Sequence, residues 1–120
     1  MFYPKTFRKN KLGNRKTIVD AITFDSAKEA RRYSELKIMQ RAGLISDLII
    51  KPRFELVPKF KINGISFRKM EYEADYQYTE NGEMVIEDVK GFKTEVYKMK
   101  KKLLHFKFAN LCVKFIFKET

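Results

Sequence analysis

The dipeptide Asn81-Gly82 constrains the fold of this chain most, because it predicts a tight β-hairpin. Asn-Gly between two strand-like segments is the strongest short signal for a two-residue type I′ turn. With these two residues as the loop, counting back along both strands places Asp75 directly opposite Asp88. Directly opposed side chains share one face of a sheet, with Cβ atoms roughly 4.5–5.5 Å apart. The sequence therefore predicts two carboxylates at one point, which repel each other unless a cation lies between them.

The residues around this carboxylate pair extend the pattern and leave one alternative open. Lys90 lies two residues after Asp88, so on a strand both side chains point to the same face. Glu73 is then opposite Lys90, which favours a cross-strand ion pair. A three-residue loop would shift the pairing by one residue and would place Glu87 opposite Asp75. The acidic partner of Asp75 therefore depends on the length of the turn.

The charge of the chain indicates a polyanionic partner. Its 120 residues include 26 Lys and Arg against 15 Asp and Glu, which gives a formal net charge of +11. With 44% hydrophobic residues the chain can still bury a core of its own. The basic residues are clustered, which favours nucleic acid over a merely soluble basic protein. The residues that we expect to contact DNA are Arg15, Lys16, Lys93, Lys98, Lys101 and Lys102.

Several classes of protein do not fit the sequence. It contains no run of about 18 apolar residues, so we expect no membrane span. The single cysteine, Cys112, cannot form an internal disulfide, and we expect it to be buried on a strand in a reducing, cytoplasmic setting. The chain lacks a zinc-type Cys/His spacing, a Gly-rich phosphate loop and a Ser/His/Asp pattern. We therefore expect no small-molecule cofactor.

Two long helices are expected. Ser26 and Glu29 have the spacing of a capping box, which predicts a helix of about residues 27–42. Apolar residues at helical spacing predict a second helix of about residues 95–109. The apolar stripe that we expect to face the core in this second helix consists of Val96, Met99, Leu103 and Phe106.

Most of the remaining segments have the alternation and turn residues of short strands. Pro52 should divide the apolar segment 48–57 into two pieces or place it at a sheet edge. Asn63-Gly64 predicts a second hairpin, and the alternation over residues 111–117 predicts a last strand.

The order of these elements predicts an α/β sandwich. Its sheet should be mixed but mostly antiparallel, and the two long helices should flank it. We expect residues 1–16 to form a basic flexible arm and residues 17–120 to form a single domain.

The carboxylate pair has the ligand chemistry that Mg²⁺ prefers, which is hard oxygen from one or two carboxylates together with waters and substrate phosphate. Asp75 and Asp88 would supply the carboxylates, and the backbone carbonyl of Val89 is a further candidate ligand. Bound metal would activate water, and the Lys90 ammonium would orient that water or stabilise the developing oxyanion. Glu29 projects to the apolar face of its helix and is an additional candidate, although the capping box explains this residue equally well.

Asp75 and the later Asp88-Val89-Lys90 match the PD-(D/E)xK signature, with Ala74 in place of the proline. In this respect the chain resembles the restriction-endonuclease-like nucleases. It looks most similar to a family of small phage-encoded and prophage-encoded nucleases. The segments that carry this closer resemblance are Phe24 to Tyr33, Gly43 to Ile45, Phe54 to Phe60, Ala74-Asp75 and Glu87 to Gly91.

The resemblance implies a restriction-endonuclease-like core and Mg²⁺-dependent hydrolysis of DNA phosphodiesters. Asp75, Asp88 and Glu29 would hold metal, Mn²⁺ would substitute for Mg²⁺, and Lys90 would assist the nucleophile. We expect an endonuclease of phage DNA processing, recombination or repair in the cytoplasm of a bacterial host. Branched DNA and RNA are left open as substrates, and cleavage of both strands would favour a homodimer. The alternative is a basic DNA-binding module without catalysis.

Overall fold

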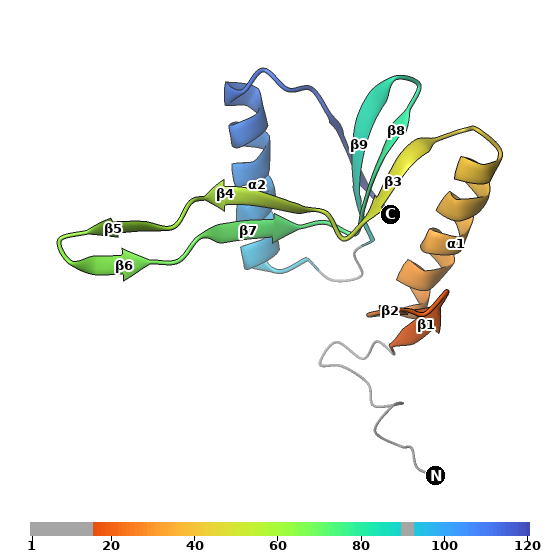
Figure 1. The fold of residues 1–120 in the computed structure, drawn as a ribbon, viewed down its shortest axis with the longest axis horizontal. Helices are drawn as coiled ribbons and strands as arrows, with labels where there is room; N and C mark the ends of the chain where they lie inside the picture. The colour runs from red at the N-terminus through yellow and green to blue at the C-terminus, as the bar shows by residue number, and fades with distance from the viewer. Residues whose placement is uncertain (1–15, 90–92) are drawn as a thin grey trace, which may run out of the picture. The chain divides into compact units, whose positions relative to one another are not determined.

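The computed structural model describes residues 16–89 and 93–120, which form two helices and ten short strands (Figure 1). The chain divides into two compact units, residues 1–46 and 47–120, and each is described by itself. The predicted basic arm falls outside the described residues except for its last position, and the single domain expected from the sequence stays a prediction.

The first unit contains a two-stranded hairpin and a helix. β1 (Thr17–Val19) pairs antiparallel with β2 (Ile22–Phe24), and α1 spans Ala27–Arg41. Phe24 packs against Tyr33 of the helix with ring centroids 5.1 Å apart, and both side chains are buried. The apolar face of α1 therefore lies against this hairpin.

Both ends of α1 follow from local sequence. At the start, the Ser26 hydroxyl accepts a hydrogen bond from the Glu29 backbone N–H at 3.1 Å, as a capping box requires. At the end, Gly43 has a φ of 81°, and the Leu44 N–H donates to the Met39 carbonyl at 2.9 Å. These contacts form a Schellman motif, which satisfies carbonyls that the last turn leaves unpaired. The first predicted helix is confirmed to within one residue.

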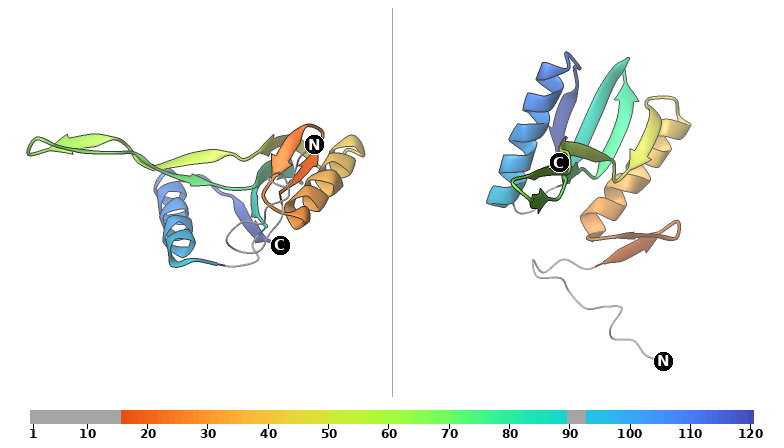
Figure 2. Two further views of the ribbon diagram at one scale, coloured as in Figure 1. Left: turned by 90° about the horizontal axis from the view of Figure 1, so that it is seen from below. Right: turned by 60° about the vertical axis from the view of Figure 1, so that its left-hand side comes forward.

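The central sheet of the second unit has four strands in the order β10-β9-β8-β3 (Figure 2). β3 spans Ser46–Ile50, and β8 (Tyr76–Glu80) and β9 (Glu83–Asp88) are antiparallel. β10 (Ile116–Glu119) runs parallel to β9, so their connection must cross over, and α2 (Glu95–Asn110) lies in that connection. The predicted α/β class, with two helices and mixed but mostly antiparallel sheets, is confirmed.

A two-stranded ribbon continues from this sheet and carries a hairpin at its end (Figure 1). β4 (Arg53–Val57) pairs antiparallel with β7 (Met70–Glu73). Further along, β5 (Phe60–Ile62) pairs antiparallel with β6 (Ile65–Phe67). Pro52 separates β3 from β4, as expected for a residue that cannot donate to a sheet ladder.

The buried face of α2 differs from the stripe predicted from the sequence. Tyr97 and Leu104 are buried, whereas Val96, Met99 and Phe106 are 61%, 61% and 63% exposed. Leu103 is half-buried, so the predicted stripe was wrong for three of its four residues. The error arose because α2 carries apolar residues on two faces about 100° apart. Contact with β4 and β7 selects the face that is buried, and this contact cannot be read from the helix alone.

The segment after α2 also differs from expectation. Cys112 is exposed with a φ of 57°, and its N–H donates to the Ala109 carbonyl at 3.2 Å. The residue therefore lies just after the end of α2, and its predicted burial on a strand was wrong. The last strand begins at Ile116, later than the predicted segment 111–117.

Substitutions on the two faces of α2 should differ sharply in their effect on stability. Leu104→Ala should lower the free energy of unfolding by about 2–5 kcal/mol, because Leu104 is fully buried in a cluster with Tyr72 and Ile86. Met99→Ala should change it by less than about 0.5 kcal/mol, because Met99 is mostly exposed. Urea unfolding followed by circular dichroism measures both values, and equal losses would restore the predicted stripe.

The turn between β1 and β2 contains a strained alanine. Asp20 and Ala21 have φ values of 53° and 63°, and the left-handed region costs an L residue roughly 1–2 kcal/mol. Ala21→Gly should therefore raise the free energy of unfolding by up to about 1 kcal/mol. Ala42→Gly is the matched control, because Ala42 has a φ of −80° and should lose about 0.5–1 kcal/mol. Thermal unfolding measures both variants, and a loss of stability in both would contradict the assigned strain at Ala21.

Candidate active site

The turn that sets the register of the β8–β9 hairpin is two residues long. Glu80 pairs with Glu83, which leaves Asn81 and Gly82 as the loop. Their φ values are 53° and 78°, and a type I′ turn needs a positive φ at both positions. The predicted two-residue turn is confirmed, and the three-residue alternative is wrong.

Asp75 and Asp88 lie together at the open end of this hairpin. The Asp75 N–H donates to Asp88 Oδ1 at 3.2 Å and to the Glu87 carbonyl at 3.1 Å. In return, the Val89 N–H donates to Asp75 Oδ2 at 2.7 Å. The backbone of each segment thus holds the carboxylate of the other, which fixes both side chains. Asp88 is fully buried and Asp75 is half-buried. The predicted adjacency is confirmed, while the role of the pair stays a prediction.

The donor set of this pair fits a hard divalent cation. Two carboxylates held close together repel each other, and burial of one of them strengthens the need for positive charge. Mg²⁺ is commonly held by one or two carboxylates together with waters and phosphate. Within the described part of the second unit, no third Asp, Glu, His or Cys side chain joins the pair in a group that could hold a metal ion.

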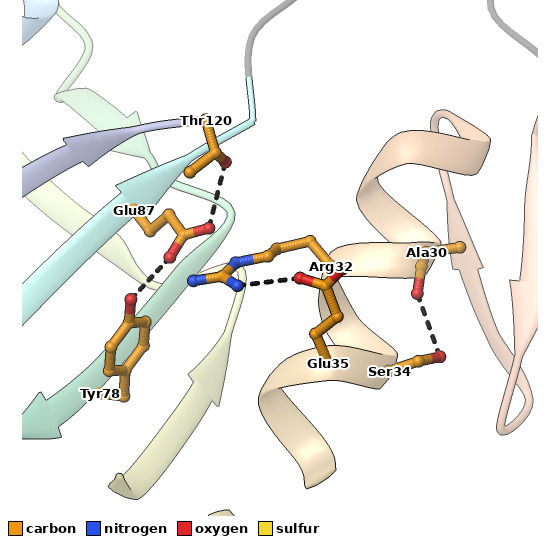
Figure 3. Close-up of polar contacts among 7 residues, drawn as sticks. All are labelled: Ala30, Arg32, Ser34, Glu35, Tyr78, Glu87 and Thr120. Carbon is orange, nitrogen blue, oxygen red and sulfur yellow. Dashed lines mark hydrogen bonds and ion pairs between the residues drawn. The ribbon is translucent and has the colours of Figure 1, made fainter. Parts of the chain in front are cut away.

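Glu87 is directed to the opposite face of β9. Its Oε1 accepts a hydrogen bond from the Tyr78 hydroxyl at 2.6 Å, and its Oε2 accepts one from the Thr120 hydroxyl at 3.1 Å (Figure 3). The side chain is fully buried, so these two donors offset much of its desolvation. Glu87 therefore has a structural environment that is separate from the carboxylate pair.

Tyr97 and Glu119 lie beside the carboxylate pair. The Tyr97 hydroxyl donates to Glu119 Oε2, and the ammonium groups of Lys93 and Lys101 each lie 3.3 Å from a Glu119 oxygen. Burial raises the pKa of Tyr97, and the hydrogen bond to Glu119 and the charge of Asp88 raise it further. The influence of Asp88 shows that this tyrosine is an electrostatic neighbour of the pair.

The sequence did not point to Glu119. This residue is in register with Asp88 because β10 runs parallel to β9. The register of parallel strands is set by the crossover through α2, and the sequence pattern of β10 carries no signal for it. An acidic residue in the last strand was the only available hint, and it is a weak one.

Four of the residues expected to bind DNA line one pocket. This pocket has a volume of about 510 Å³ and is lined by Tyr97, His105 and Glu119 together with the four lysines. Because Glu119 lines this pocket and is in register with Asp88, the pocket lies close to the carboxylate pair. The four lysines are Lys93, Lys98, Lys101 and Lys102.

The other predicted residues lie outside the described ranges or in the first unit. Lys90 and Arg15 lie outside the described residues. Lys16 is exposed in the first unit. Glu29 is half-buried in the first turn of α1, where its backbone N–H completes the helix cap. The roles expected for these four residues stay predictions.

Glu73 pairs with a residue of β4 that the sequence did not indicate. It is in register with Arg53 of β4, and the Arg53 guanidinium lies 3.2 Å from its carboxylate. The chain leaves the β8–β9 ladder at this point, because the Ala74 N–H donates to the Pro52 carbonyl at 3.1 Å. Lys90 lies outside the described residues, so the predicted place of Glu73 opposite it stays a prediction.

The structure thus defines a mixed α/β protein with a carboxylate pair, one member of which is fully buried, beside a basic pocket. The chain belongs to a family described as "Protein of unknown function (DUF1064)", whose model matches residues 9–120 and so spans both units. No curated protein matches the chain, and no solved structure does. Over the described ranges, neither helix is long and apolar enough to cross a membrane.

Removal of the Tyr97 hydroxyl should change the titration of Glu119. The hydrogen bond from Tyr97, helped by Lys93 and Lys101, holds the pKa of Glu119 at about 2, below its usual 4.5. A lowered pKa means that ionised Glu119 stabilises the fold above about pH 4.5 and that this contribution is lost as the pH falls towards 2. Tyr97→Phe should raise this pKa and weaken the acid dependence.

The titration can be followed by NMR of the Glu119 carboxyl carbon. Tyr72→Phe is the matched control, because the buried Tyr72 hydroxyl has no hydrogen-bond partner among the described residues. This control should leave the pKa of Glu119 unchanged. An unaltered Glu119 titration in Tyr97→Phe would contradict the assigned cause.

Proposed function

We propose that this chain is a metal-dependent endonuclease that hydrolyses phosphodiester bonds in DNA. The observation that carries the proposal is the pair of Asp75 and Asp88, each held by a backbone N–H of the other segment. Val89-Lys90 follows Asp88 in the sequence, which completes the pattern that the chain shares with PD-(D/E)xK nucleases. The net charge of +11 supports a polyanionic substrate.

The proposed fold is a restriction-endonuclease-like core. The order of the elements supports it, because a helix with Glu29 in its first turn precedes the hairpin that carries the carboxylates. The crossover helix α2 then leads to a parallel strand beside that hairpin. This order is the one that the sequence resemblance implies.

Asp75, Asp88 and the Val89 carbonyl would hold Mg²⁺ or Mn²⁺, with Glu29 as an additional ligand. When bound, the cation would lower the pKa of a water and neutralise charge on the phosphate. The crossed backbone hydrogen bonds hold both carboxylates in place before any ligand arrives, and preorganised groups need little rearrangement during reaction. Lys90 would orient the attacking water or stabilise the oxyanion.

The lysine pocket would hold the DNA backbone next to the carboxylates. Lys93 and Lys101 form ion pairs with Glu119. Among the residues that the structure describes, Lys98 pairs only with Glu95, at 3.3 Å and in an exposed position. Such contacts are independent of base sequence and weaken steeply as salt rises. The proposed setting is phage DNA processing, recombination or repair in a bacterial cytoplasm, and a homodimer would be needed to cut both strands together.

The same lysine pocket favours one alternative, a DNA-binding module without catalysis. In that case the carboxylates would only balance nearby lysines. The two functions differ in their response to chelation, because binding through lysines survives EDTA and metal-dependent cleavage does not.

Cleavage should require a divalent cation and the carboxylate pair. Asp88→Asn should lower the cleavage rate by more than the roughly 10–100-fold loss that follows removal of an outer-shell partner, because the amide cannot replace a carboxylate ligand. Asp47→Asn is the matched control: Asp47 is exposed, and asparagine tolerates its φ of 57°. The assay compares linear, nicked, flapped and four-way DNA, and a matching RNA, in Mg²⁺, Mn²⁺ and EDTA.

Binding must be measured beside cleavage. Asp88→Asn should bind labelled DNA at least as well as the unchanged chain, because it removes one negative charge. Full cleavage by Asp75→Asn protein would refute the proposed site. Salt-sensitive binding without nicking in any metal, and without calorimetric heat on addition of Mn²⁺, would establish the alternative.

A further inference from the structure

The β5–β6 hairpin has an exposed apolar face. Phe60 is in register with Phe67 and Ile62 with Ile65, so these four side chains share one face. The two phenyl rings stack with centroids 4.8 Å apart. The four side chains are 43–57% exposed, and every residue from 58 to 70, the two strands and the turn included, is exposed. Nothing in the described part of the chain covers this face.

The opposite face of the hairpin is basic. Lys61 is in register with Ser66, and Lys59 and Arg68 are the next positions on the same face. Residues 58–70 contain no Asp or Glu. None of these three cations forms an ion pair with a residue that the structure describes. Their charge is therefore available to a partner.

The hairpin is an arm that is fixed at one end. The β4–β7 ribbon from which it continues lies against α2 (Figure 2). There Phe54 contacts Phe108 edge-on with ring centroids 5.7 Å apart. Arg53 braces the ribbon through ion pairs to Glu71 and Glu73 at 3.6 and 3.2 Å. Beyond the ribbon, β5 and β6 contact only each other among the described elements.

Charge and area favour a polyanion over a second copy of the chain. Two copies would each bring a net charge of +11. Pairing of the apolar faces would bury roughly 400 Å² per copy, since four half-exposed large side chains contribute about 100 Å² each. A standard interface needs about 800 Å² per partner. By contrast, the major groove of DNA admits a two-stranded ribbon between two walls of phosphates.

We propose that the β5–β6 hairpin is a DNA-binding arm that enters a groove of the duplex. Lys59, Lys61 and Arg68 contact the phosphates, while Ile62 and Ile65 at the tip lie against base edges or enter a base step. The inference takes only its class of partner, DNA, from the proposed function and does not depend on catalysis. The arm would add binding surface remote from the lysine pocket and would orient the duplex over the carboxylate pair.

Removal of the arm's charges should lower the salt dependence of binding. The test variant is Lys59→Gln/Lys61→Gln/Arg68→Gln, measured by fluorescence anisotropy of labelled duplex DNA in EDTA over a salt series. The slope of log K against log salt should fall by about 2–3, because each phosphate contact contributes roughly 0.9. The matched control, Lys28→Gln/Arg31→Gln/Lys114→Gln, removes the same number of charges from other surfaces. It should leave the slope nearly unchanged.

A second variant tests the apolar tip. Ile62→Ser/Ile65→Ser should keep the salt slope and weaken duplex binding on the order of tenfold, since two partly exposed side chains lose their contacts with bases. Both side chains are more than half exposed, so circular dichroism should show an unchanged melting temperature.

Two results would refute the proposed DNA-binding role of the arm. Equal loss of slope in the arm and control triples would show that only net charge matters. Unchanged DNA binding in Ile62→Ser/Ile65→Ser, together with dissociation of an oligomer in sedimentation, would assign the apolar face to a second copy. The proposed endonuclease is tested separately, because all these binding measurements are made in EDTA. DNA binding that depends on the arm, without cleavage in any metal, would support the DNA-binding arm and refute the endonuclease.

Discussion

The crossed hydrogen bonds between Asp75 and the end of β9 are the contacts on which the candidate site depends. The Asp75 N–H reaches Asp88 Oδ1, and the Val89 N–H reaches Asp75 Oδ2. The Asp75 carbonyl also accepts the Lys51 N–H at 2.8 Å, at the bend between β3 and β4. One residue thus joins the hairpin, the sheet edge and the start of the ribbon. The position of the carboxylates is consequently a property of the backbone, and a bound ligand does not have to create it.

β9 carries two successive buried carboxylates, Glu87 and Asp88, and their surroundings differ. Glu87 accepts hydrogen bonds from two hydroxyl groups, which help to offset the cost of its burial on the structural face. Asp88 faces the side where Tyr97 and Glu119 lie, and there the negative charge accumulates. Nearby lysines gather on the same side. Because successive side chains of β9 point to opposite faces, Glu87 supports the fold while Asp88, the next residue, belongs to the candidate site.

Short sequence motifs correctly predicted the features of the fold that depend only on neighbouring residues. Asn81-Gly82 fixed the pairing of β8 with β9, because a two-residue turn leaves no freedom of register. The choice between the two apolar faces of α2 required knowledge of its contact with Tyr72 and the ribbon, so the sequence selected the wrong one. The place of Glu119 beside Asp88 depends on the parallel register of β10. The place of Glu73 beside Arg53 depends on the pairing of β7 with β4. Both are decided by pairing between distant segments.

The two basic surfaces of the second unit differ in how readily they can accept phosphate. Lys93 and Lys101 already share Glu119, whose pKa of about 2 keeps it ionised at neutral pH, so a phosphate in the pocket must compete with a carboxylate. The cations of the β5–β6 arm face no such competitor among the described residues. On the proposed function, the arm would therefore supply most of the salt-dependent affinity. The pocket would bind phosphate firmly only when a cation at Asp75 and Asp88 offsets the surrounding negative charge, which would couple occupancy of the metal site to engagement of DNA.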